Sequence, residues 1–198
     1  MKFNMSSLFS ERKAAEVAAY FLIRAQKTNS NITILKLMKL MYLAERLSYE
    51  RFCYPIIGDA LVSMPNGPVL SGTLDLINSG SLPNGDGSWE ALIAAKSGRD
   101  MSLKSDVNLT IDDLRELSEA DIEVLDSIWV EFGRWSAFRL RDYTHNPNNC
   151  PEWQDPDGSS IPIELATLLE KLGYSASDIE KSVSNTRKQA WINSKLSD

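Results

Sequence analysis

The chain has 198 residues, of which 43% are hydrophobic and 24% charged, and its formal net charge is −6. This length is close to that of one ordinary domain, and the composition excludes a disordered, collagen-like or low-complexity chain. We therefore expect a single compact domain spanning residues 1–198.

The cysteine content and the hydropathy pattern indicate a cytoplasmic protein. Cys53 and Cys150 lie far apart and give no disulfide framework, and no apolar run after the basic start resembles a signal peptide. The longest apolar stretch, residues 32–44, is interrupted by Lys36 and Lys39 and is too short to span a bilayer. We expect no membrane segment.

Charge is distributed unevenly along the chain. Residues 1–57 contain nine Lys or Arg against four Asp or Glu, whereas residues 100–131 contain ten acids against Lys104 and Arg115. The acidic stretch repels phosphate, which disfavours nucleic-acid binding, and it suits a cationic protein partner. The alternative interpretation of this stretch is an ordinary solvated helix face. Four of its acids are candidate partner contacts: Asp112, Asp113, Glu116 and Glu119.

Two helices are predicted in the first third of the chain. Ser10 precedes apolar residues at three- and four-residue steps and predicts a helix over residues 11–27. Thr33 can cap a second helix that reaches about Glu50. On this second helix the polar residues form only a narrow stripe, so we expect it to lie at the centre of the fold.

The middle of the chain predicts a small amount of β structure. Residues 56–64 resemble a strand that ends at a Pro-Asn-Gly-Pro turn, and Pro68 can open a helix that runs to Gly80. Residues 80–88 predict a loop. Residues 89–95 and 101–103 are then expected to form a hairpin.

Helical signals return in the second half. Ser118 predicts a helix start and Gly133 a left-handed stop. Ser136 can cap a short helix that ends near His145, because Asn146 precedes a proline.

The remaining residues complete the predicted fold. Residues 146–160 are expected to form a loop, followed by helices over about 162–172, stopped by Gly173, and 176–194. The fold class is therefore α+β and mainly α-helical, with a central buried helix and a small antiparallel β element.

The sequence offers little for metal or cofactor chemistry. One histidine and two cysteines form no Cys-x-x-Cys or His-x-x-x-His pair, and we expect no metal and no cofactor. The glycines of residues 80–87 lack the Lys-Ser/Thr of a phosphate-binding loop. A nucleophilic pair of Cys150 and His145 remains open, although no oxyanion loop is evident.

Two ionisable residues each allow two interpretations. Asp142 and His145 are three positions apart on a predicted helix and can hydrogen-bond, or His145 can bond nearby carbonyls and pack on Trp153. Glu45 projects among apolar residues opposite Lys36 and Lys39. It is either buried and paired, as a structural or a functional carboxylate, or placed where the helix returns to solvent.

Three blocks of sequence resemble the Panacea domain of bacterial and prophage antitoxins, the SocA-like or GepA-like family. They are residues 36–44, residues 58–69 with 74–77, and residues 132–136 with Leu140, Thr144, His145 and Trp153. The Met-Pro-x-Gly-Pro-Val turn of the second block is the most specific feature. The resemblance covers residues 11–155, and the helices over about 162–194 match more loosely.

The resemblance implies a mainly helical α+β domain that neutralises a co-encoded toxin by direct binding and has no catalytic activity. Alternatives are an adaptor that delivers the toxin to a protease and a small hydrolase-type enzyme that uses Glu45 or His145. Family members pair with toxins of several unrelated classes, and this sequence does not indicate which class its partner belongs to. A homo-oligomer is also possible.

Candidate partner-binding residues outside the acidic stretch come from the turn and from the third block. They are Met64, Asn66, Gly67, Pro68, Arg141, Asp142, His145 and Trp153. Two geometric predictions accompany them: His145 lies within about 8 Å of Trp153, and Gly67 has a positive φ.

Overall fold

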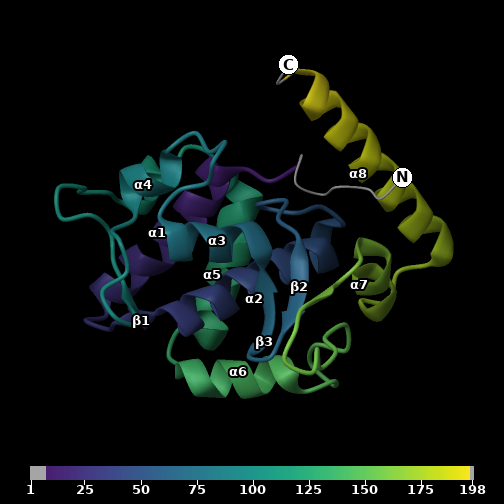
Figure 1. The fold of residues 1–198 in the computed structure, drawn as a ribbon, viewed down its shortest axis with the longest axis horizontal. Helices are drawn as coiled ribbons and strands as arrows, with labels where there is room; N and C mark the ends of the chain where they lie inside the picture. Colours follow the sequence, from purple (N-terminus) through teal and green to yellow (C-terminus); the bar gives the residue numbers. More distant parts are fainter. Residues whose placement is uncertain (1–7, 197–198) are drawn as a thin grey trace.

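The computed structural model describes residues 8–196, so the two ends of the expected domain lie outside the described residues (Figure 1). The helices of this part are α1 (Glu11–Lys27), α2 (Ile34–Phe52), α3 (Ser71–Ser79), α4 (Ser88–Leu92), α5 (Glu119–Phe132), α6 (Ala137–His145), α7 (Leu165–Lys171) and α8 (Ala176–Leu196). The strands are β1 (Ile32–Thr33), β2 (Leu61–Met64), β3 (Gly67–Leu70), β4 (Asp100–Met101) and β5 (Ile161–Pro162). The structure confirms a mainly helical α+β fold.

Helix α2 is the centre of the fold, as its composition predicts. It packs against α1, α5, α6 and the strand β3. Both caps expected at the first two helices are present, because Ser10 accepts from the N–H of Lys13 and Thr33 from the N–H of Lys36. The narrow polar stripe of α2 does not face solvent in its first half, where Lys36 is 8% and Lys39 0% exposed.

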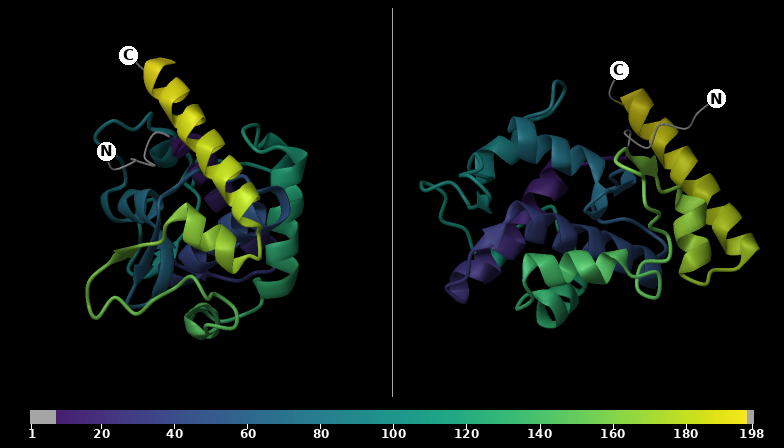
Figure 2. Two further views of the ribbon diagram at one scale, coloured as in Figure 1. Left: turned by 90° about the vertical axis from the view of Figure 1, so that its right-hand side faces the viewer. Right: turned by 60° about the horizontal axis from the view of Figure 1, so that its bottom comes forward.

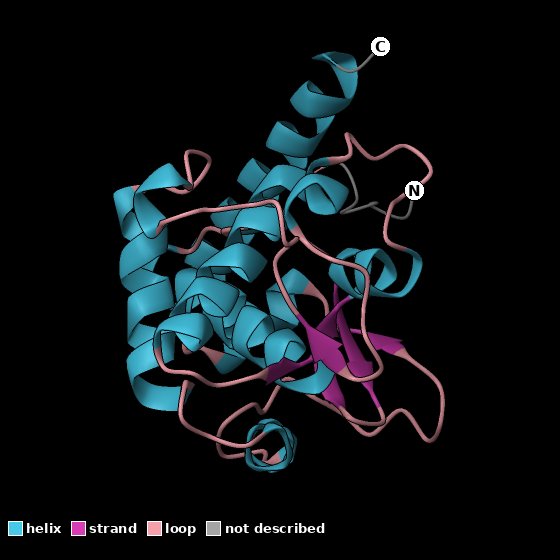
Figure 3. Ribbon diagram, turned by 90° about the vertical axis from the view of Figure 1, so that its left-hand side faces the viewer, coloured by secondary structure: helices cyan, strands magenta, loops and turns pink. Residues whose placement is uncertain are grey.

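The strands form two small antiparallel sheets, which lie to one side of the helical core (Figure 3). The order of the larger sheet is β3-β2-β5, and that of the smaller is β1-β4. Within β2 and β3, Met64 pairs with Gly67, so a two-residue turn connects the strands.

The start of the helix after this turn differs from the prediction. Pro68 lies inside β3 and α3 begins three residues later, at Ser71. β3 is an edge strand, where a residue without an N–H is tolerated. The carboxylate of Asp59 caps α3 by accepting from the N–H groups of Gly72 and Thr73. The strand before the turn is also shorter than residues 56–64, since it begins at Leu61.

The hairpin expected over residues 89–103 is only partly present. Residues Ser88–Leu92 form helix α4 instead of a strand. Antiparallel bridges join Ile93 to Leu103 and Ser97 to Asp100. Trp89 is 2% exposed in α4 because this helix packs on α1, so burial against a helix, and not strand pairing, decides its conformation.

Helices α5 and α6 have the predicted starts. Ser118 forms a capping box with Asp121, and Ser136 accepts from the N–H of Arg139. The left-handed stop at Gly133 is wrong, because its φ is −57° and the chain turns directly into α6. A Cβ at Gly133 would lie 2.5 Å from the Trp129 carbonyl oxygen, so the glycine is required by space and not by φ. Helix α6 ends at His145, as predicted.

The final elements are two helices and a short strand. Ile161 and Pro162 form β5 on β2, so α7 begins at Leu165 and not at Pro162. Gly173, with φ +88°, follows α7 as expected. Helix α8 packs on α7, and its C-terminal end projects from the body of the molecule (Figure 2). Among the described residues, no helix combines the length and apolar character needed to cross a membrane.

Candidate functional site

The turn between β2 and β3 is built around Gly67. Its φ is +91°, which confirms the prediction of a positive φ. A Cβ at this position would lie 2.7 Å from Nζ of Lys39 and 2.8 Å from Oγ1 of Thr144. Only glycine therefore permits both the backbone conformation and the close approach of α2 and α6 to the turn.

His145 and Trp153 hold the same turn from outside. Their ring centroids are 4.4 Å apart in an edge-to-face arrangement, well within the predicted 8 Å. Nε2 of His145 lies 3.0 Å from the Pro65 carbonyl oxygen, and Nε1 of Trp153 donates to the Met64 carbonyl oxygen at 3.2 Å. The end of α6 and the loop after it are thus fastened to the turn.

The structure selects the second interpretation of His145. Its Nδ1 lies 2.8 Å from the Arg141 carbonyl oxygen, so both ring nitrogens face backbone carbonyls. Asp142 instead accepts from the guanidinium of Arg141, with Nη2 2.7 Å from Oδ1. A neutral imidazole donates to only one carbonyl at a time, whereas the protonated ring donates to both.

A buried lysine lies beneath the turn. Lys39 on α2 is fully buried, and its Nζ donates to the Pro68 carbonyl oxygen at 2.8 Å. Burial lowers the pKa of Lys39 to about 7, because desolvation penalises the charged amine. On the same helix Lys36 donates to the Gly133 carbonyl oxygen at 2.7 Å, and burial lowers its pKa too. The two lysines therefore fasten β3 and the α5–α6 junction to the central helix.

A groove of about 630 Å³ opens beside the turn, between the start of α2 and helix α6. Met64, Asn66 and Arg141 line it together with Pro65, so the groove borders three of the sequence-predicted residues. Its other lining residues are mostly apolar: Ile34, Leu35, Met38, Val69, Leu74, Ala137 and Phe138, together with Thr33, Lys39 and Arg99.

The acidic candidates lie elsewhere. Oε1 of Glu116 lies 3.7 Å from Nη1 of Arg12, a residue in the first turn of α1. The carboxylate of Asp113 accepts from Thr110 in a capping box. Asp112 and Glu119 are exposed near them in the chain. The first turn of α1 lies near the top of Figure 1 and α6 at the bottom, so the predicted contacts form two separate surfaces.

Glu45 is buried and paired, one of the alternatives its position allowed. It is 0% exposed and accepts from the N–H groups of Ile56, Ile57 and Gly58 at 2.8–3.0 Å. Burial outweighs these three hydrogen bonds and raises the pKa of Glu45 to about 7. Its contacts hold the segment that leads into β2.

The loop after α6 contributes another buried carboxylate, that of Glu152. It accepts from the hydroxyl of Tyr42 at 2.6 Å and from Nε of Arg46 at 2.8 Å. Cys150 is also buried, and burial raises the pKa of its thiol to about 12. A thiol with this pKa is protonated at neutral pH, whereas the nucleophile is the thiolate. This argues against the hypothesis that Cys150 and His145 form a nucleophilic pair.

Sequence reasoning missed the roles of Asp59 and Glu152. Asp59 stands in the second of the three sequence blocks, and this was the available signal for a structural role. Glu152 has no local signal, because its partners are on α2, more than 100 positions earlier.

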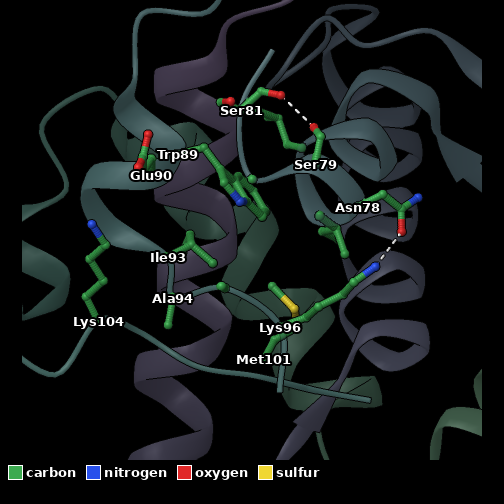
Figure 4. A pocket seen from close by; sticks show the side chains of 14 residues that line it. Asn78, Ser79, Ser81, Trp89, Glu90, Ile93, Ala94, Lys96, Met101 and Lys104 are labelled. Atoms are coloured by element: carbon green, nitrogen blue, oxygen red, sulfur yellow. Dashed lines mark hydrogen bonds between the residues drawn. The ribbon is translucent and has the colours of Figure 1, made fainter. Parts of the chain in front are cut away.

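A second pocket, of about 400 Å³, lies between the end of α3 and α4 (Figure 4). Trp89, Ile93 and Met101 point toward it, and Lys96 donates to Oδ1 of Asn78 at its edge. None of the sequence-predicted contacts lines this pocket. Within residues 8–196 there is also no group of three His, Cys, Asp or Glu side chains positioned to hold a metal ion.

Comparison with known proteins identifies the family. Residues 37–154 match the family described as antitoxin SocA-like, Panacea domain. Neither a search of curated proteins nor a search of solved structures gave a match to the chain. The matched residues include α2 from Leu37 onward, the β2–β3 turn, α6 and Trp153, which contact one another in the structure. The chain therefore belongs to the family of SocA-like antitoxins with a Panacea domain.

Proposed function

We propose that this chain neutralises a co-encoded toxin by direct protein–protein binding and without turning over a substrate. The observation that carries the proposal is the match to an antitoxin family over residues 37–154, which includes the turn, α6 and the loop that ends at Trp153. An antitoxin family implies a toxin partner.

The environments of the two enzyme candidates support a binding role. Glu45 is fully buried and its carboxylate is used by three backbone N–H groups. Both ring nitrogens of His145 lie within 3.0 Å of backbone carbonyl oxygens, those of Arg141 and Pro65. Each side chain is therefore engaged in holding the fold, and a general acid or base must instead reach a substrate proton.

Co-expression with the product of the adjacent reading frame tests this function. We expect that product to stop growth alone and growth to return when this chain is present. With purified proteins, inhibition of the toxin should rise linearly with added chain and be complete at a fixed stoichiometry. Full inactivation by a small fraction of one equivalent, or a covalently altered toxin, would contradict a binding mechanism.

A further inference from the structure

The groove between α2, the β2–β3 turn and α6 has an apolar wall. Leu35, Met38, Met64, Val69 and Leu74 line it. Its volume of about 630 Å³ is enough to receive several atoms of a partner side chain, since pockets for whole small ligands occupy roughly 300–1,000 Å³. If an apolar side chain of a partner entered this groove, water would be released from the side chain and from the groove wall.

One large apolar side chain at the edge of the groove is mostly exposed to solvent. Phe138 on α6 is 60% exposed and lies with its ring 5.2 Å from the guanidinium carbon of Arg141. An exposed aromatic side chain that borders an apolar groove is typical of an anchor for a protein partner.

The ionisable side chains that line the groove all carry positive charge when protonated. They are Lys39, Arg99 and Arg141, and no Asp or Glu is among the lining residues. This is notable in a chain whose formal net charge is −6. Lys39 is fully buried, so the charges that a partner can reach are those of Arg99 and Arg141. Arg141 also pairs with Asp142 of its own helix, which does not line the groove. Arg99 is exposed, and its carbonyl oxygen accepts from the N–H of Ile34, which places it beside the first turn of α2.

We propose that this groove is the docking site for the toxin, and that it takes an apolar side chain flanked by carboxylates. The apolar side chain lies between α2 and α6 against Phe138, and the neighbouring carboxylates face Arg99 and Arg141. This inference rests on the proposed function, because it assigns the surface and the chemistry of the same partner.

A photocrosslinking experiment tests the surface directly. p-Benzoylphenylalanine is placed at position 138 and, as a control, at Val130, an apolar residue of α5 that is 83% exposed and does not line the groove. The probe is the purified product of the adjacent reading frame. We expect crosslinks from position 138 and not from 130, to a toxin segment with Asp or Glu close to an apolar residue. A formed complex with no crosslink from 138, or a crosslink to a basic segment, would overturn the proposal.

A matched pair of charge reversals tests the electrostatics. Arg141→Glu reverses a groove charge, whereas Arg139→Glu reverses a charge on the same helix that stacks on Trp135 outside the groove. We expect Arg141→Glu to weaken toxin binding at least tenfold and Arg139→Glu to change it less than threefold, with unaltered circular dichroism in both. Equal effects of the two reversals would overturn the proposal.

Three further outcomes show whether this proposal, the proposed function or both fail. If the wild-type chain binds and neutralises the toxin while Phe138→Ala and Arg141→Glu do so equally well, the groove is not the docking site and the antitoxin function stands. If the wild-type chain does not bind the toxin, both fail. A small molecule retained by the wild-type chain in native mass spectrometry and lost in Phe138→Ala, with unchanged toxin binding, would assign the groove to a small ligand instead.

Discussion

His145 packs edge-on against Trp153, and the two side chains bond successive carbonyls of one turn, those of Pro65 and Met64. Residues about 80 to 90 positions apart in the chain thereby fix the backbone of the β2–β3 turn. The contact between His145 and Trp153 therefore joins α6 to the loop after it and also stabilises the β2–β3 turn.

Substitutions of Trp153 should separate its hydrogen bond from its packing. Trp153→Phe keeps an aromatic ring against His145 but removes the donor to Met64, so we expect a loss of about 1 kcal/mol in the free energy of unfolding. Trp153→Ala should cost about 2 kcal/mol or more, because the ring contact is lost as well. Urea denaturation measures both, and equal losses would show that the hydrogen bond alone matters.

Gly67→Val should destabilise the fold through two effects. A side chain at φ +91° costs about 1–2 kcal/mol, and its Cβ would also collide with Lys39 and Thr144. Gly80→Val is the matched control, since φ there is +82° but no atom lies within 4 Å of the added Cβ. We expect Gly67→Val to lower the denaturation midpoint more than Gly80→Val. Equal shifts would mean that the collision is relieved at no cost.

The stability of the protein should rise with pH through the contribution of Lys39. Its pKa is about 7 in the fold against an ordinary 10.5, so between these values the unfolded chain binds more protons than the folded one. The free energy of unfolding therefore rises by up to about 1.4 kcal/mol per pH unit from this group. Lys39→Met has no titratable amine at this position and therefore lacks this pH-dependent contribution to stability.

Urea denaturation of wild type and Lys39→Met at pH 6.5 to 9.5 checks this prediction. The difference in stability between the two should move in favour of the wild type as pH rises. A constant difference would show that Lys39 keeps its charge in the folded protein.

Glu45 should contribute the opposite slope at lower pH. Its pKa rises from an ordinary 4.5 to about 7 on folding, so between these values the folded chain binds more protons. The contribution of Glu45 to stability is complete below pH 4.5 and is lost as pH rises through 7. Relative to Glu45→Gln, the wild type should lose up to about 1.4 kcal/mol per pH unit across this range. A relative gain would mean that the three N–H groups hold the carboxylate ionised.

The acidic surface is expected to accelerate toxin capture. Reversal of Asp112, Asp113, Glu116 and Glu119 to lysine should lower the association rate by about three- to tenfold at low salt and reduce its salt dependence, with little change in the dissociation rate. Asp113 also caps a turn through Thr110, so the pair Asp112→Lys and Glu119→Lys isolates the effect of charge.

Surface plasmon resonance at several salt concentrations measures these rates. If association at low salt is unchanged by both sets of reversals, the acids serve solubility. The dissociation rate should in either case respond more to Arg141→Glu, because the groove and not the acidic surface is the proposed contact.

The sequence alone predicted those features that depend on nearby residues. The starts of α1, α2, α5 and α6 follow from Ser10, Thr33, Ser118 and Ser136, because a capping side chain bonds an N–H only two or three positions ahead. The end of α6 at His145 follows from the restriction that a proline places on the residue before it.

Where a segment can pair with distant partners, local signals were insufficient. Pro68 is compatible with a helix start and with an edge strand, and its place in β3 depends on β2. Residues 88–92 form a helix because α1 offers a surface to bury Trp89. Pro162 joins a strand because β2 leaves an edge for it.

The sequence by itself determined the mainly helical class, the central helix and the residues of the turn, because composition, periodicity and capping act over short distances. Only the tertiary structure decided how those residues are used. In the fold, Lys39 is buried and donates to the Pro68 carbonyl oxygen. His145 lies against two backbone carbonyls and not against Asp142. The acidic surface and the groove lie on different parts of the molecule. The physical reason is that burial and hydrogen-bond partners come from segments far apart in the chain, which meet only when the core has packed.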